Sequence, residues 1–110
     1  MTGDAQIQAV IRKIVRKLVE GYAPQKIILF GSYAYGQPDE DSDIDLLIIK
    51  ATAESFLDRM ETVERLVAGM HPHIPFEPLV LTPEEVEERV RAGDQFIAEI
   101  LEKGEVLYDA

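Results

Sequence analysis

The chain has 110 residues, no cysteine and a formal charge of −10, with 21 acidic side chains against 11 basic ones. Without cysteine it forms neither disulfides nor thiolate metal sites, and the excess of acid repels a phosphate backbone, so we expect no nucleic-acid partner. A hydrophobic share of 46% fits a single domain over residues 1–110 in the cytoplasm, and no apolar stretch approaches the roughly 20 residues that span a membrane.

The first predicted element is an amphipathic helix from about Asp4 to Tyr22. Apolar residues recur there every three or four positions, which is the spacing of one helix face. The opposite face holds a basic cluster, made of Arg12, Lys13, Arg16 and Lys17. We interpret this cluster as a solvated surface, with a docking surface for a partner as the alternative. Gly21 and Pro24 end the helix before a strand at Ile27–Phe30.

A glycine turn follows this strand. Gly31 lacks a Cβ atom and therefore permits turn conformations and a close approach to a ligand, while the Ser32 hydroxyl can donate to a phosphate oxygen. Gly36 permits a second sharp bend. The polar stretch from Pro38 to Asp41 predicts an exposed loop.

Two carboxylates stand where this loop enters the next strand. Asp43 and Asp45 precede the apolar run Leu46–Ile49, and alternate residues of a strand point to the same face. Carboxylates held side by side repel each other unless a cation lies between them. Hard oxygen ligands of this kind suit magnesium, so the sequence predicts a Mg²⁺ site.

A second amphipathic helix is predicted from Phe56 to Met70, followed by His71, Pro72 and His73. We interpret the two histidines as loop residues, with zinc binding as the alternative. A third strand is predicted at Ile74–Leu81.

Glu77 is the lone charge within this third strand, and a carboxylate buried there without a partner is costly. It is therefore a sensible third metal ligand. The alternatives are a surface charge at a strand end and a site that has lost its activity. Adjacent Pro78 removes one backbone donor from the strand.

The rest of the chain predicts two helices and a strand. Thr82 and Glu85 form a capping box with Pro83 at the first helical position, and Val86 and Val90 are expected to face the core. Gly93 and Asp94 interrupt the helix. The last elements are a helix at Gln95–Glu102, which presents Phe96, Ile97, Ile100 and Leu101, and a strand at Glu105–Tyr108.

The central motif resembles that of a known family. Gly31-Ser32, three residues, Gly36, five residues and then Ser42-Asp43-Ile44-Asp45-Leu46 match the signature GSxxxGxxxxxSDxDL of the minimal nucleotidyltransferases, a branch of the DNA polymerase β-like superfamily. A weaker similarity covers nearly all of the remaining chain. In this family an aspartate before a Leu-Thr-Pro-like sequence completes a carboxylate triad. Here Leu81-Thr82-Pro83 puts Glu77 at that position, with one methylene more than aspartate.

The resemblance implies the nucleotidyltransferase fold, an α/β domain with a mixed sheet of about four strands flanked by helices. It also implies transfer of AMP from ATP to a hydroxyl, assisted by two Mg²⁺ ions. Asp43, Asp45 and Glu77 would be the catalytic metal ligands. Gly31 and Ser32, together with Asp43, would bind the nucleotide.

The acceptor is expected to come from a partner, because the predicted helices and a four-strand sheet use up the chain. The resemblance suggests a HEPN-domain toxin, with AMP transferred to one of its tyrosines by this chain as antitoxin. The alternatives are an inactive antitoxin that only occludes its partner, and an enzyme that nucleotidylates a small molecule. A homo- or hetero-oligomer is compatible with each. Tyr33 and Tyr35, expected to be exposed, are suited to a partner interface or to stacking on a base.

Overall fold

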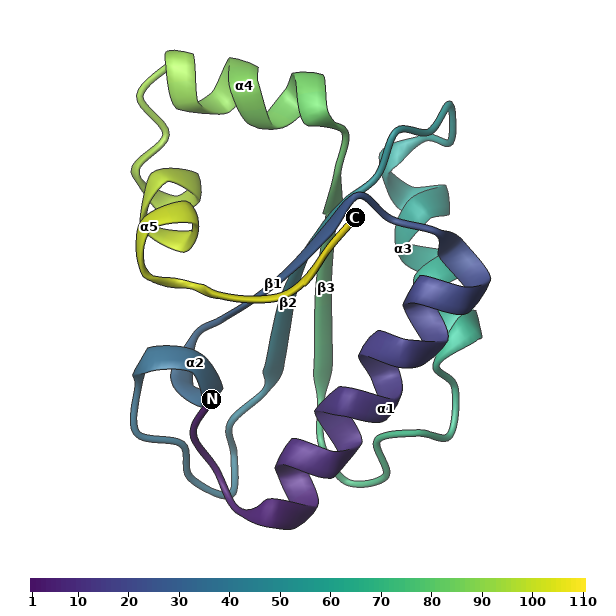
Figure 1. Cartoon of the computed structure of the whole chain (residues 1–110), viewed down its shortest axis with the longest axis vertical. Helices are drawn as coiled ribbons and strands as arrows, with labels where there is room; N and C mark the ends of the chain where they lie inside the picture. The colour runs from purple at the N-terminus through teal and green to yellow at the C-terminus, as the bar shows by residue number, and fades with distance from the viewer.

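A computed structural model describes residues 1–110, which form five helices and four strands (Figure 1). The elements in chain order are α1 (Ala5–Tyr22), β1 (Lys26–Phe30), α2 (Ser32–Tyr35), β2 (Ile44–Ile49), α3 (Phe56–Leu66), β3 (Phe76–Leu81), α4 (Pro83–Arg91), α5 (Gln95–Lys103) and β4 (Glu105–Asp109). The predicted α/β class is confirmed. No helix combines the length and the apolar character needed to cross a membrane.

The four strands form one mixed sheet in the order β3-β2-β1-β4. β1 runs antiparallel to β2 and to β4, whereas β2 and β3 are parallel. In this register Asp45 of β2 lies opposite Phe30 of β1 on one side and opposite Glu77 of β3 on the other. One row across three strands therefore contains a phenylalanine and two carboxylates.

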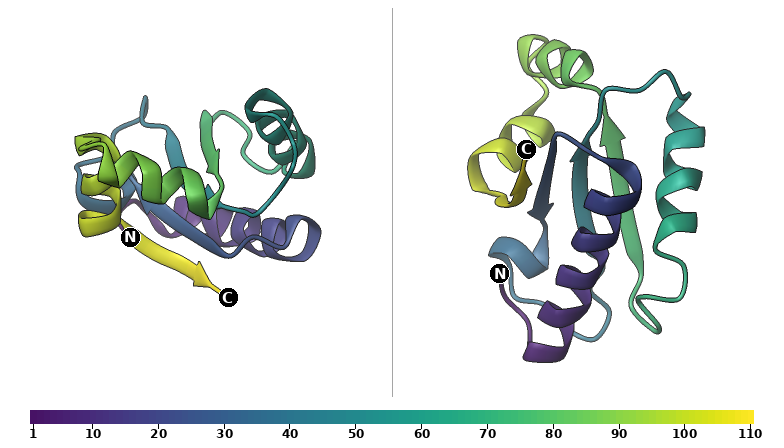
Figure 2. Two further views of the ribbon diagram at one scale, coloured as in Figure 1. Left: turned by 90° about the horizontal axis from the view of Figure 1, so that it is seen from above. Right: turned by 45° about the vertical axis from the view of Figure 1, so that its right-hand side comes forward.

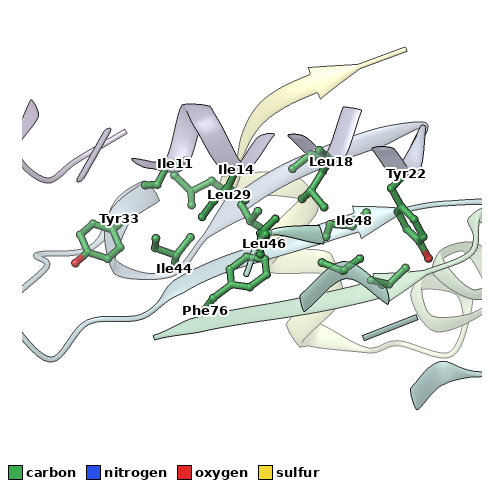
Figure 3. Close-up of a cluster of buried hydrophobic side chains, with 14 residues drawn as sticks. Ile11, Ile14, Leu18, Tyr22, Leu29, Tyr33, Ile44, Leu46, Ile48 and Phe76 are labelled. Atoms are coloured by element: carbon green, nitrogen blue, oxygen red, sulfur yellow. The ribbon is translucent and has the colours of Figure 1, made fainter. Parts of the chain in front are cut away.

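The two faces of the sheet are covered by different helices. On one face Ile44, Leu46 and Ile48 pack against α1 and α3 in a core of 14 buried residues (Figure 3). On the other face Leu47 packs in a smaller cluster with residues of α4 and α5, among them Ile97. Figure 2 shows α3 and α5 on opposite sides of the strands. The strand positions that alternate with the larger core thus face α4 and α5.

The segment between β1 and β2 differs from its prediction as a turn and loop, because it begins with the short helix α2. The Gly31 carbonyl accepts hydrogen bonds from the amides of Ala34 and Tyr35, and the Gly36 amide donates to the carbonyl of Ser32. Gly36 is required by space, since a Cβ there would lie 2.7 Å from Cα of Ser32. The predicted bend at Gly36 is confirmed.

Two predicted boundaries were wrong. Helix α3 ends at Leu66 and not at Met70, and a turn with Gly69 at φ 81° follows it. Strand β3 begins at Phe76 and not at Ile74, because the Ile74 amide donates to the carbonyl of His71 within a turn.

Two predicted side-chain environments were also wrong. Val90 is 44% exposed, and Val86 is the one buried residue of α4. Tyr33 is only 5% exposed and belongs to the larger core, whereas Tyr35 is 43% exposed as predicted. In α5, Ile97 is buried and Phe96 is 51% exposed.

The one buried charged residue is Arg59 of α3, which joins three elements. Its guanidinium donates to both carboxylate oxygens of Glu85, at 2.6 and 3.2 Å, and to the carbonyl of Val80 at 3.2 Å. Glu85 also accepts from the Thr82 amide, which closes the predicted capping box. Arg59 therefore fixes the start of α4 to α3 and β3.

Candidate active site

The three predicted carboxylates lie on the same face of the sheet. Because Ile44 and Leu46 point to the larger core, Asp45 between them points to the opposite face, and Asp43, which directly precedes β2, lines the same pocket as Asp45. Glu77 pairs with Asp45 in the parallel register of β2 and β3. All three line one open pocket of about 480 Å³. The sequence prediction that Asp43 and Asp45 share a face is confirmed.

The pKa of the Asp45 carboxyl group is raised by burial and by its acidic neighbours. Its pKa rises from 3.8 to about 6, first because the side chain is partly buried and then because the charges of Asp43 and Glu77 oppose its ionisation. A cation in the pocket would reverse the effect of the two neighbouring charges. This electrostatic arrangement favours a bound cation.

The donor set fits Mg²⁺ in its chemistry, since the pocket offers three carboxylates and neither a thiolate nor an imidazole ligand. The three side chains do not form a preassembled cluster, because no three carboxylate or imidazole groups of the chain converge closely enough to hold an ion. Glu77 is exposed, while Asp43 and Asp45 are half-buried. The assignment of Glu77 as a third ligand therefore stays a prediction.

Gly31 is fixed beside Asp45 by the backbone. Its φ of 74° and ψ of −158° lie in a region that residues with a side chain rarely adopt. A Cβ atom on residue 31 would also overlap Oδ2 of Asp45. Ser32 follows directly as the first residue of α2. Glycine at position 31 thus allows the Asp45 carboxylate to lie against the turn.

An aromatic wall borders the carboxylates, and the sequence interpretation did not include it. Phe30 of β1 and Phe96 of α5 pack edge to face, with ring centroids 5.6 Å apart and an interplanar angle of 83°. Both rings line the carboxylate pocket, together with Phe56 and Met60 of α3. The sequence of β1 does indicate the position of Phe30. Side chains of a strand alternate between faces, so Phe30, which follows Leu29 of the larger core, must point to the carboxylate face.

The remaining predicted residues lie apart from these carboxylates. Nδ1 of His71 donates a hydrogen bond at 2.8 Å to the carbonyl of Ile74 within the turn before β3. The basic cluster is exposed on α1, the helix that covers the other face of the sheet, and consists of Arg12, Lys13, Arg16 and Lys17. Neither group contributes to the carboxylate pocket.

Comparison with known proteins agrees with the fold and the motif. A protein of Methanocaldococcus jannaschii named "Putative protein adenylyltransferase" is 36% identical over 64 residues, which are 56% of this chain and 64% of that protein. The protein adenylyltransferase MntA of Thermococcus cleftensis is 33% identical over 63 residues, covering 57% of this chain and 64% of MntA. The matches span from 45% to 64% of the length of these curated relatives.

Solved structures share the fold. A crystal structure of a toxin–antitoxin with AMP-PNP superposes with a TM-score of 0.61 at 20% identity, covering 90% of this chain and 73% of that one. The model of the family described as "Nucleotidyltransferase domain" matches residues 9–109. The resemblance inferred from the motif is confirmed, and the chain belongs to the nucleotidyltransferase domain family.

Proposed function

We propose that the chain is a magnesium-dependent nucleotidyltransferase that transfers AMP from ATP to a tyrosine hydroxyl of a HEPN-domain toxin, and so acts as an antitoxin. The observation that carries the proposal is the shared pocket of Asp43, Asp45 and Glu77 on one face of the sheet. The relatives named protein adenylyltransferase support the reaction. The similarity to the antitoxin MntA and to toxin–antitoxin structures supports the partner.

The reaction forms a bond between the acceptor oxygen and the α-phosphorus of ATP and breaks the bond from that phosphorus to the bridging oxygen, so that pyrophosphate leaves. In this proposal the acceptor proton passes to a carboxylate oxygen of Glu77, which is exposed and therefore accessible to an incoming hydroxyl. Asp43 and Asp45 would hold metal, and Glu77 would also be a ligand of the second ion. Bound Mg²⁺ would neutralise triphosphate charge and lower the pKa of the acceptor hydroxyl.

The turn after β1 is assigned to the phosphates. Gly31 leaves space for a close approach of Asp45, and the Ser32 hydroxyl donates to a phosphate oxygen. Phe30 and Phe96 offer ring surfaces in the same pocket. Phosphates, metal and acceptor are thereby assigned to adjacent parts of one surface.

The proposal is tested by incubating the chain with ATP labelled at the α-phosphate, Mg²⁺ and a HEPN-domain protein encoded beside it. Wild type should label a tyrosine of that protein, and Asp43→Ala should not. Asp41→Ala changes an exposed carboxylate of the same loop that lies outside the pocket and should label like wild type. Equal labelling by wild type and Asp43→Ala would overturn the assignment.

One observation favours a second candidate, an antitoxin that binds its partner without catalysis. Glu77 is exposed, and the three carboxylates are not drawn together in advance. Calorimetry separates the two functions, because an active site should bind ATP only with Mg²⁺ and lose this binding in Asp45→Asn. Neutralisation of the toxin in the absence of ATP, by wild type and Asp45→Asn alike, would support the binding role.

A further inference from the structure

A second cavity, of about 270 Å³, lies beside α2 and contains none of the three carboxylates described above. Three segments form its wall: the start of α1 with Asp4, the stretch after β1 with Tyr33, Asp39 and Glu40, and the turn before β3 with His73. We refer to it as the acidic cavity. No lysine or arginine lines it, so its charge is strongly negative.

The hydroxyl of Tyr33 has no hydrogen-bond partner within the protein. The side chain is 95% buried, its ring packs in the larger core, and Gly3 lies against the ring. No hydrogen bond joins its hydroxyl to another group of the protein. No completely buried side-chain polar atom of the chain lacks a partner, so this hydroxyl reaches the cavity. Figure 3 shows its oxygen turned away from the packed side chains.

The acidic side chains around this hydroxyl retain acceptor capacity. Asp4 uses Oδ1 to accept from the Ile7 amide, and Asp39 uses Oδ1 to accept from the Asp41 amide. The second oxygen of each carboxylate is left for a ligand. Burial first, and then the charges of Asp4, Asp39 and Asp43, raise the pKa of the Tyr33 hydroxyl.

The acidic side chains of the cavity come from separate segments, Asp4 from the start of α1 and Asp39 and Glu40 from the loop before β2. An organic cation suits this site, because an ammonium or guanidinium group has several N–H donors that can reach carboxylates spread around a cavity.

We propose that the acidic cavity binds an alkylammonium or guanidinium group, whose N–H donors bond to Asp4, Asp39 and Glu40 and to the hydroxyl oxygen of Tyr33. Such a group belongs either to a lysine or arginine side chain of a protein or to a free polyamine. A cation bound here contacts the neighbours of two residues of the carboxylate site, because Tyr33 follows Ser32 and the lining residue Ser42 precedes Asp43. Occupancy would thus join the start of α1 to the loop that precedes β2.

The test is a titration of the intact chain, followed by amide chemical shifts at low ionic strength. The probes are a capped Gly-Arg-Gly peptide and spermidine, and the neutral control is the same peptide with citrulline in place of arginine. Arginine peptide or spermidine should shift the amides of Tyr33 and Asp39, and citrulline peptide should not. Tighter binding of the peptide assigns the natural cation to a protein side chain, and tighter binding of spermidine assigns it to a polyamine.

Variants locate the binding. Tyr33→Phe removes only the hydroxyl and Asp39→Asn keeps the Oδ1 acceptor, and each should weaken binding by about fivefold or more. Asp41→Asn, which changes an exposed acid of the same loop outside the cavity, should bind like wild type. Glu40→Gln should also weaken binding. Because Glu40 is exposed, this change leaves the core intact.

Three results would overturn the proposal. The first is equal binding by wild type, Tyr33→Phe and Glu40→Gln. The second is a loss of affinity in Asp41→Asn as large as that in Asp39→Asn, which would mean that binding depends on the overall negative charge of the loop and not on the cavity. The third is displacement of the organic cation from these residues by millimolar-range Ca²⁺ at constant ionic strength, which would identify the cavity as a metal site.

Discussion

Gly31, directly after β1, lies so close to Asp45 of β2 that a Cβ atom on residue 31 would overlap the Asp45 carboxylate. The glycine also has a positive φ of 74°, so both the backbone and the space beside it exclude a side chain. The turn and the carboxylate are therefore one structural unit. A change at position 31 should affect stability and activity together.

We expect Gly31→Ala to lower the free energy of unfolding by roughly 2 to 4 kcal/mol and to abolish AMP transfer. About 1 to 3 kcal/mol comes from the backbone of positive φ and extended ψ, and the rest from displacement of Asp45. Gly93→Ala is the matched control, because Gly93 has φ 84° and open space around its Cβ position. It should show only the backbone cost and full activity. Equal effects of the two variants, measured by denaturant unfolding and by label transfer, would contradict the overlap with Asp45.

Asp45→Asn should stabilise the protein at neutral pH while abolishing its activity. The pKa of Asp45 is raised from 3.8 to about 6 in the fold, so the native state binds this proton more tightly than the unfolded chain. Protonation of Asp45 therefore contributes to the free energy of unfolding below about pH 4, and this contribution is lost as the pH rises through about 6. The cost of ionisation at pH 7.5 is roughly 1 to 2 kcal/mol, after allowance for the half-exposed side chain.

Denaturant unfolding at two pH values measures this effect. The free energy of unfolding of Asp45→Asn should exceed that of wild type at pH 7.5 and equal it near pH 4. Mg²⁺ should stabilise wild type more than the variant. Asp41→Asn, at an exposed position, should differ from wild type by less than about 0.5 kcal/mol at both pH values. If Asp45→Asn is no more stable than wild type at pH 7.5, then burial and the neighbouring carboxylates do not make the ionisation of Asp45 unfavourable.

Glu77→Gln should leave the unfolding free energy within about 0.5 kcal/mol of wild type, because the side chain is exposed, and should reduce AMP transfer by roughly 10²-fold. Glu77→Asp should retain more activity than Glu77→Gln, since it keeps the carboxylate. Glu84→Gln, an exposed glutamate outside the pocket, is the control for loss of one charge. Full activity of Glu77→Gln at saturating Mg²⁺ would remove Glu77 from the site.

Patterns that depend on strand alternation could be predicted from the sequence. The spacing of Asp43 and Asp45 placed both carboxylates on one face, and Leu81-Thr82-Pro83 placed Glu77 on the strand beside them. Both depend on local regularities that a short motif contains. The positions of the helices that cover the sheet depend on contacts between distant segments.

Tyr33 and α2 could not be predicted for this reason. Four residues are too short to show helical periodicity, and the burial of Tyr33 arises because Gly3 and the larger core enclose its ring. Val90 was predicted to be buried from its spacing to Val86, but α4 reaches the core only near its start. Arg59 resembles any polar residue of an amphipathic helix, and only the fold brings Glu85 to it.

We expect Arg59→Ala to lower the free energy of unfolding by roughly 2 to 4 kcal/mol. The change removes two hydrogen bonds to Glu85, one to the Val80 carbonyl and one to the Glu54 carbonyl, and it leaves Glu85 without its cation. Amide hydrogen exchange should rise most in α4, whose first turn this pair anchors. Arg65→Ala breaks an exposed pair with Glu61 in the same helix and should cost less than about 0.5 kcal/mol. Similar costs for the two variants would show that burial of Arg59 is unimportant.

We propose that one face of the sheet binds Mg²⁺ and ATP through Asp43, Asp45 and Glu77. A crystal structure with a non-hydrolysable ATP analogue and Mg²⁺ would show whether these residues hold both ligands. We predict metal density between Asp43 and Asp45, a Glu77 side chain that has turned to join it, and terminal phosphates beside Gly31 and Ser32. A triphosphate bound elsewhere, or Mg²⁺ held without either aspartate, would contradict the account.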